Sequence, residues 1–339
     1  MARTLPTDDR DWLDVDRREE PPERVSLPAW SWLALVFVLA FWVRGPLAGL
    51  LDGPALRTWT TIFVSISVQA LPFLVLGVVL SGAITALVPP GWLARALPQR
   101  PLVAVPAAGL AGVALPGCEC GAVPIAGRLT ARGVPPAAAF AFMLAAPAIN
   151  PVVLVSTAVA FPGRPEVVGA RFVASLATAV AVGMLWARLG RDAWIDRARQ
   201  VAVEGGTRWQ AFTQTTQHDF LHAGGWLVVG AMTAATLQVA VPRSVLDAVA
   251  GNQTLAVLGL AALAVVLAVC SEADAFVAAS LNQFSLTARL VFMVVGPVVD
   301  LKLIALQTGV FGRRFALRFA PLTLAVAVVS GCAVGWWLL

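Results

Sequence analysis

The sequence predicts an all-α polytopic membrane protein that consists of two homologous halves. Of its 339 residues, 59% are apolar and only 13% are charged, and the mean hydropathy is +0.81. A soluble chain of this length would expose more charge. Segments of about 20 apolar residues have the length of a membrane-spanning helix. The apolar segments are residues 28–51, 59–88, 102–127, 135–161, 167–189, 223–241, 255–281, 286–311 and 316–338.

An internal repeat supports the division into halves. Phe73–Leu93 resembles Trp226–Leu246 at an offset of 153, and Cys118 aligns with Cys270 at an offset of 152. Such duplication is typical of secondary transporters. The residues that recur at an offset of 150 are Phe142, Met143, Pro147 and Asn150, which become Phe292, Met293, Pro297 and Asp300.

The charges predict how the chain is divided and oriented. All basic residues except one are arginines, and most lie in short gaps between apolar segments, as the positive-inside rule describes, so no nucleic-acid partner is expected. We expect the N-terminus in the cytoplasm of a bacterial-type plasma membrane. The predicted parts are a disordered acidic cytoplasmic tail (1–27), a first transmembrane helix (28–58), a first permease repeat (59–189), a cytoplasmic Arg-rich loop (190–222) and a second permease repeat (223–339).

The topology depends on whether every apolar segment crosses the membrane. Nine simple spans would place the Arg-rich loop 190–222 outside, against the positive-inside rule. A re-entrant segment 102–127 removes this conflict, because its prolines and glycines divide it into pieces too short to span. Its counterpart 255–281 would then re-enter from the opposite face, and the halves would be inverted repeats with broken or re-entrant helices at the Cys motifs. Nine simple spans remain the alternative.

The first Cys motif is Cys118-Glu119-Cys120, which has Pro116-Gly117 before it and Gly121 after it. Two thiols one residue apart can converge on one ligand only where the backbone is unwound, because positions i and i+2 of a helix do not share a face. Thiols and a carboxylate at such a place are typical of a site for a soft, thiol-seeking species. The alternative is that the cysteines only pack and that Glu119 lies at the membrane interface.

The second motif contains Cys270, Glu272 and Asp274 within a mainly apolar segment. Ionisable residues inside such a segment indicate a functional site. The alternative is that residues 270–285 have already left the bilayer and that these acids are solvated.

Prolines and charges near the ends of two segments are candidates for coupling and gating. Pro147 precedes Asn150 at the spacing at which Pro297 precedes Asp300, and a proline inside a helix frees backbone carbonyls. Lys302 is the only lysine of the chain. Helical spacing argues against Asp300 as its partner, and Glu119, Glu272 or Asp274 could pair with it instead. A purely structural ion pair is the alternative.

His218 and His222 are four residues apart, a spacing that can bind a transition metal. With no third ligand assigned, the signal is weak, and a solvated pair is the alternative.

Three stretches together resemble a known family. They are GCECGAVPIAGRLTARGVPPAAAFAFMLAAPAINPVVL at 117–154, CSEADAFVAAS at 270–280 and GPVVDLK at 296–302. The resemblance, which extends from about residue 59 onward, is to the predicted-permease family that includes the methylarsenite efflux permeases. It implies export of a trivalent organoarsenical, or of copper or zinc as in other members, and a separately encoded partner subunit. The family's first motif often has Cys-Ser-Cys, whereas Glu119 replaces the serine here.

We therefore expect a secondary transporter of the plasma membrane, and not an enzyme, that exports a thiophilic metal or metalloid species such as a trivalent (organo)arsenical or a Zn or Cu ion. Cys118, Cys120 and Cys270 would bind this small molecule or ion. We expect no cofactor, and the sequence leaves oligomers open. The alternatives are a membrane thiol oxidoreductase that uses Cys118 and Cys120, and a permease for a non-metal solute that acts with a partner subunit.

Overall fold

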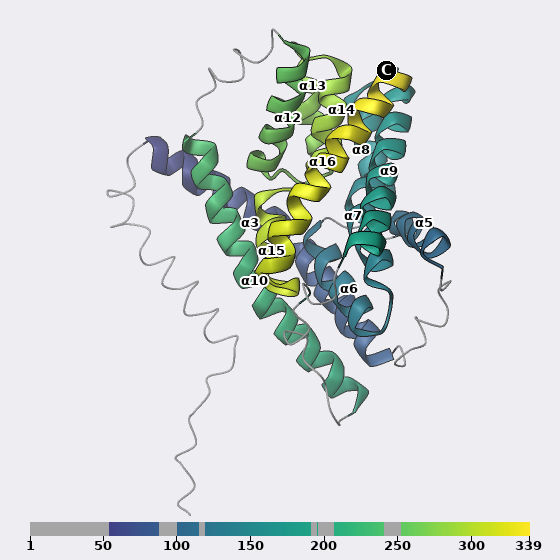
Figure 1. Ribbon diagram of the computed structural model, residues 1–339. Helices are drawn as coiled ribbons and strands as arrows, with labels where there is room; N and C mark the ends of the chain where they lie inside the picture. Colours follow the sequence, from purple (N-terminus) through teal and green to yellow (C-terminus); the bar gives the residue numbers. More distant parts are fainter. Residues whose placement is uncertain (1–53, 88–99, 115–118, 191–194, 196–206, 241–251) are drawn as a thin grey trace, which may run out of the picture. The chain divides into compact units, whose positions relative to one another are not determined.

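The computed structural model describes residues 54–87, 100–114, 119–190, 195, 207–240 and 252–339, and these residues contain α-helices and one short 3₁₀ helix but no β-strand (Figure 1). The tail 1–27, the apolar segment 28–51 and Pro116-Gly117-Cys118 lie outside the described residues. The helices of the first half are α3 (Pro54–Leu87), α5 (Pro101–Ala111), η1 (Gly112–Ala114), α6 (Glu119–Ala131), α7 (Pro136–Ile149), α8 (Pro151–Ala160) and α9 (Pro165–Leu189). The helices of the second half are α10 (Arg208–Ala240), α12 (Gln253–Leu267), α13 (Asp274–Ser280), α14 (Leu286–Val295), α15 (Leu301–Phe311) and α16 (Arg313–Leu338).

The two halves repeat one order of helices. Each has a long helix, then two pairs of short helices, then a second long helix. Packing repeats as well, since α5 packs on α7 as α12 packs on α14, and α7 packs on α9 as α14 packs on α16. The internal duplication expected from the sequence therefore reappears in the helix order and in the packing.

Corresponding helices of the two halves run antiparallel. Trp59, near the start of α3, donates to Thr236 near the end of α10 (3.0 Å), whereas Ser81, near the end of α3, donates to Asp219 in the first half of α10 (2.7 Å). The end of α9 likewise lies against the start of α16, where Trp186 packs on Phe315. Inverted repeats require this antiparallel arrangement. Their orientation in a bilayer stays a prediction.

Five helical segments of the described residues are long and apolar enough to cross a membrane, which confirms the all-α polytopic prediction. They are α3, α7 together with α8, α9, α10 and α16. The segments 102–127 and 255–281 are each divided instead. Their longest apolar helices are Pro101–Ala114 and Gln253–Leu267, which are shorter than the roughly 20 residues of a span. Whether these two segments re-enter stays a prediction.

The breaks at Asn150 and Asp300 have local causes. Asn150 ends α7 and caps α8, because its Oδ1 accepts from Val153 N (3.0 Å) and its Nδ2 donates to Ala146 O (3.0 Å). The side chain thus bonds backbone groups on both sides of the break, where Pro151 supplies no N–H. Asp300 caps α15 in the same way, by accepting from Leu303 N at 2.6 Å.

The start of α10 differs from the expected loop 190–222, because the helix already begins at Arg208. Thr207 N donates to Gln210 Oε1 (2.9 Å), and Gln210 N donates to Thr207 Oγ1 (3.3 Å). This reciprocal pair is a capping box, which starts a helix in polar sequence. Residues 208–222 also contain no glycine or proline that would stop it.

Gly77 is required where α3 crosses α6. A Cβ atom at this position would lie 2.3 Å from Gly121 Cα. We predict that Gly77→Ala destabilises the protein by about 1–3 kcal/mol, because the two backbones must separate. The midpoint of thermal unfolding of the purified protein, followed by tryptophan fluorescence, measures the effect. Gly169→Ala in α9 is the control, since no atom lies within 4 Å of its added Cβ. Equal behaviour of the two variants would contradict the prediction.

Candidate functional site

Lys302 is the centre of a buried group of charges. Its Nζ lies 2.5 Å from Glu119 Oε1 and 3.3 Å from Asp300 Oδ2, and all three side chains are almost completely inaccessible to solvent. Glu119 begins α6 of the first half, and Lys302 lies in the first turn of α15 of the second half. The ion pair with Glu119 therefore joins the two halves.

Two predicted cysteines interact with the same ammonium group. Cys270 Sγ is 3.9 Å from Lys302 Nζ, and Cys120 is within range of an electrostatic interaction with Lys302. Both cysteines are buried. Lys302 also donates to Ala268 O at 2.9 Å, at the end of α12. Cys270 of the second half is thus in contact with the cation and Cys120 of the first half is within its electrostatic range, whereas Cys118 lies outside the described residues.

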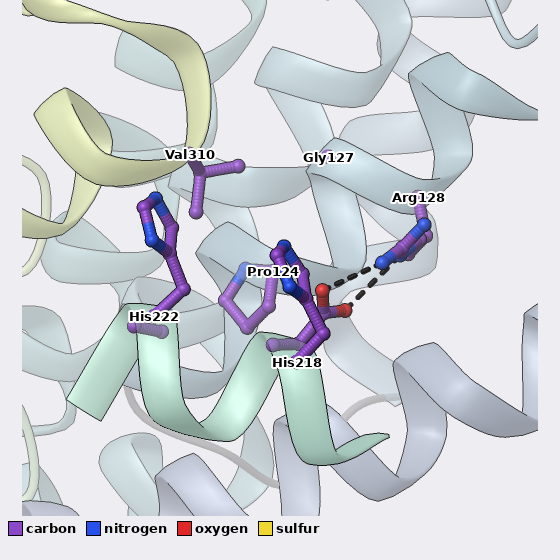
Figure 2. A pocket seen from close by; sticks show the side chains of 8 residues that line it. Pro124, Gly127, Arg128, His218, His222 and Val310 are labelled. Carbon is purple, nitrogen blue, oxygen red and sulfur yellow. Dashed lines mark hydrogen bonds and ion pairs between the residues drawn. The ribbon is translucent and has the colours of Figure 1, made fainter. Parts of the chain in front are cut away.

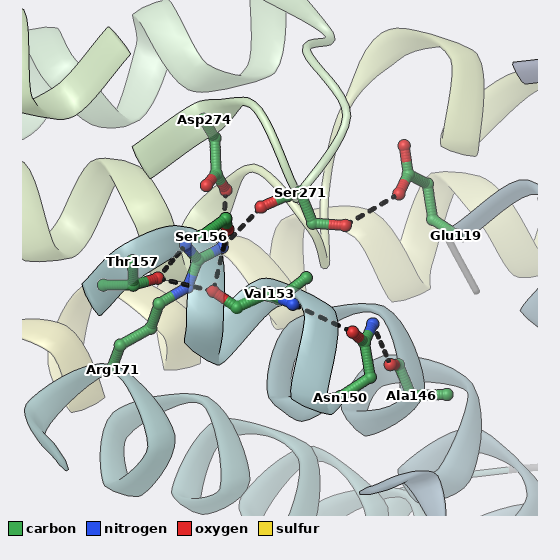
Figure 3. Close-up of polar contacts among 9 residues, drawn as sticks. All are labelled: Glu119, Ala146, Asn150, Val153, Ser156, Thr157, Arg171, Ser271 and Asp274. Carbon is green, nitrogen blue, oxygen red and sulfur yellow. Dashed lines mark hydrogen bonds and ion pairs between the residues drawn. The ribbon is translucent and has the colours of Figure 1, made fainter. Parts of the chain in front are cut away.

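Ser271 connects the two Cys motifs. Its Oγ donates to Glu119 Oε2 over 3.4 Å, so the residues that follow Cys118 and Cys270 in their aligned motifs touch each other (Figure 3). The two broken segments therefore meet in the structure. Glu272, the next residue, is only half-buried, and it is within electrostatic range of Glu119 and Lys302.

Arg171 is the functional candidate that the sequence analysis missed. Its Nη2 donates to Asp274 Oδ2 (2.8 Å) and to Ser271 O (3.1 Å), and its Nη1 donates to Thr157 Oγ1 (2.8 Å). The arginine is completely buried in α9, within the apolar segment 167–189. An arginine inside such a segment was the available signal, because a charge at membrane depth is costly.

The coupling candidates divide into caps, prolines and the central lysine. Asn150 and Asp300 are buried helix caps at corresponding breaks, and Asp300 also contacts Lys302. Pro147 lies within α7, three residues before its break, and Pro297 lies in the turn between α14 and α15.

The buried charges and thiols described above form one group, which we call the central cluster. It comprises Glu119, Cys120, Arg171, Cys270, Ser271, Asp274, Asp300 and Lys302.

The two histidines line a separate small cavity of about 30 Å³ between α6, α10 and α15 (Figure 2). The rings of His218 and His222 are stacked, with centroids 5.8 Å apart. Arg128 forms an ion pair with Asp219 over 2.6 Å beside them, and His222 Nε2 is 3.0 Å from Gly309 O. No residue of the central cluster lines this cavity.

Arg132, in the turn after α6, contributes a further charge near this cavity and donates to Thr85 O. Burial, and after it the positive charge of Arg128, lowers the pKa of Arg132 from its ordinary value. Two arginines therefore lie near each other at the end of α6, and one of them, Arg128, is paired with Asp219 of α10.

Within the part of the chain that the structure describes, no three His, Cys, Asp or Glu side chains are grouped as a metal site requires. Cys118 lies outside this part. Metal binding by Cys118, Cys120 and Cys270, or by His218 and His222, stays a prediction.

A multi-pass helical protein with charged side chains where broken helices meet has the architecture of a membrane permease. The chain belongs to the family described as Predicted permease, whose model matches residues 55–336. It is 39% identical over 276 residues to the UPF0718 protein YcgR of Bacillus subtilis (strain 168), which covers 79% of this chain and 93% of that relative. A second relative, from Streptococcus mutans (serotype c, strain ATCC 700610 / UA159), is named as a two-component membrane permease complex subunit. The chain is 31% identical to it over 283 residues, and this alignment covers 81% of the chain and 94% of the relative. No solved structure matches the chain.

Lys302→Met tests whether the central cluster depends on its cation. The substitution keeps the shape of the side chain but leaves Glu119 and Asp300 buried without the ammonium group. We predict a loss of about 3–5 kcal/mol, the usual cost of removing one partner of a buried ion pair. Thermal unfolding of the purified protein measures it, with Arg313→Met at an exposed position as the control.

A charge-neutral variant separates electrostatics from packing. Lys302→Met combined with Glu119→Gln and Asp300→Asn removes all three charges and keeps the cap, since Asn150 performs the same function at the corresponding break. We expect this triple variant to be more stable than Lys302→Met alone. A triple variant that is no more stable than Lys302→Met would show that lost packing, and not uncompensated charge, causes the loss.

Proposed function

We propose that this permease is a plasma-membrane secondary transporter that exports a thiophilic metal or metalloid species through the central cluster. The observation that carries the proposal is that Cys270 Sγ lies 3.9 Å from the ammonium group of Lys302, with the buried Cys120 of the other half within electrostatic range of the same group. Soft species are bound by thiolates, and the ionisable residues lie where broken helices meet, as in transporters.

Lys302 would favour the reactive form of these thiols. An adjacent positive charge stabilises a thiolate, and the thiolate is the form that binds a soft metal or metalloid. Trivalent methylarsenite carries two hydroxyl groups, which two thiols can replace with release of two water molecules. A pair of thiols is thus sufficient for this cargo, whereas structural zinc sites use four ligands.

The net charge of the central cluster favours binding of a positively charged species. Glu119, Asp274 and Asp300 supply three buried carboxylates, and Arg171 and Lys302 supply two cations. One negative charge is left over when all five are ionised and the thiols are neutral, each thiolate adds another, and a buried excess charge is costly. A bound cationic cargo would compensate this excess charge. For a neutral cargo, a proton that is transported in the opposite direction would compensate it.

A separate subunit would complete the transporter in the proposal. The relative from Streptococcus mutans is named as a subunit of a two-component membrane permease complex. The present chain resembles that relative over most of the length of both proteins, and we extend the two-component arrangement to it on this basis.

Transport into everted membrane vesicles tests the proposed function. The cargo panel is methylarsenite, arsenite, Zn(II) and Cu(I), with a neutral sugar as the negative cargo. We predict that wild-type vesicles accumulate at least one thiophilic cargo. Cys118→Ser/Cys120→Ser and Cys270→Ser should each lower the initial rate roughly tenfold or more, because binding loses its sulfur donors.

Cys332→Ser is the matched control, because this cysteine lies in α16 and belongs to neither motif. It should transport like the wild type. Absence of accumulation of all four thiophilic cargoes, in vesicles that contain folded protein together with any co-encoded subunit, would refute the proposal. Accumulation that survives both sets of serine substitutions would refute the role of the thiols.

A further inference from the structure

Arg171 reaches from the first half of the chain into the break that carries Cys270. It projects from α9, and its Nη2 holds both Ser271 O and Asp274 Oδ2, as Figure 3 shows. Its Nη1 is bound in turn to Thr157 Oγ1, whose hydroxyl donates to Val153 O in α8 (2.7 Å). The bond to Thr157 therefore holds the guanidinium group against α8 of the first half, independently of its contacts with the second half.

Local backbone bonds fix only part of the break: Ala273 N and Asp274 N both donate to Cys270 O (2.9 and 3.0 Å), which forms a turn after the cysteine. Residues 268–273 separate α12 from α13, and they contain neither glycine nor proline. Ala268 has a φ of 48°, a left-handed conformation that is unfavourable for a residue with a Cβ atom. Such a conformation persists only where surrounding contacts impose it.

Two buried cations bind the backbone of the break on either side of Cys270. Lys302 donates to Ala268 O, two residues before the cysteine, and Arg171 donates to Ser271 O, the residue after it. The first cation belongs to the same half as Cys270, and the second belongs to the other half. The position of the thiol thus depends on how the halves lie relative to each other.

We propose that Arg171 is a positioning residue of the permease, which fixes the break at Cys270 from the opposite half and so sets where this thiol lies. The guanidinium group binds a hydroxyl through Nη1 and a carbonyl and a carboxylate through Nη2, and the single nitrogen of a lysine cannot occupy both of these positions. The consequence for transport rests on the function proposed above, whereas the fixed position of Cys270 does not.

Alkylation of Cys270 tests the positional part without any cargo. In a full-length variant that keeps only this cysteine (Cys118→Ser/Cys120→Ser/Cys332→Ser), the rate of modification by N-ethylmaleimide in membranes is measured by mass spectrometry. Arg171→Lys should raise the rate roughly tenfold, the factor that corresponds to the loss of one hydrogen bond to a charged group. Arg188→Lys, at an exposed position of the same helix, should leave the rate unchanged.

A second variant keeps the test decisive if the first one does not fold. Arg171→Gln/Asp274→Asn removes both members of the ion pair, so no charge is left buried alone. Size-exclusion chromatography selects the folded fraction, in which Cys270 should again be alkylated faster. Alkylation at the wild-type rate in every folded variant would overturn the proposal.

Transport kinetics separate positioning from general loss of structure. With a cargo that the wild type transports, Arg171→Lys should raise KM by a larger factor than it lowers the maximal rate, because binding uses the displaced thiol. An equal KM with faster alkylation would also overturn the assigned role. Absence of transport by the wild type would refute the proposed function and would leave the alkylation result intact.

Discussion

Compensation of buried charge is the constraint on which the rest of the structure depends. Where helices are interrupted at membrane depth, backbone groups and ionisable side chains have no water and must find partners in the protein. Lys302 forms ion pairs with Glu119 and Asp300 and donates to Ala268 O. Arg171 forms an ion pair with Asp274 and donates to Thr157 Oγ1 and Ser271 O. Lys302 thereby joins the start of α6 and the cap of α15 to the break between α12 and α13, and Arg171 joins α8 and α9 to the same break.

The two ion pairs are also exchanged between the halves. Glu119 of the first half pairs with Lys302 of the second, and Asp274 of the second half pairs with Arg171 of the first. Buried ion pairs contribute little net stability compared with apolar packing of the same volume, so stability alone does not account for them. They do make the central cluster sensitive to relative movement of the halves, since no such movement leaves both pairs unchanged. A permease that opens alternately to two sides needs this kind of sensitivity.

Much of the fold follows from local sequence. Apolar segments of spanning length appear as helices, and the repeat found at offsets of 150 to 153 appears as a repeated helix order. The break at Asn150-Pro151 is predictable because proline removes a donor and asparagine caps. The start of α10 was also present in the sequence, as Thr207 and Gln210 at capping-box spacing, but the polar composition of 190–222 concealed it.

The pairings within the site are not predictable in this way, because they depend on how the halves pack. The sequence offered Glu119, Glu272 and Asp274 as partners for Lys302, and only tertiary structure selects Glu119, which is 183 positions away. Helical spacing argued against Asp300, yet Asp300 contacts Lys302 because it is an extended cap (φ −143°, ψ 171°) outside the helix. Arg171 likewise has a partner that is not predictable from the sequence. Its position in an apolar segment marks it as unusual, but its partner, Asp274, is 103 residues away, and no spacing rule connects two helices that only the packing of the halves brings together.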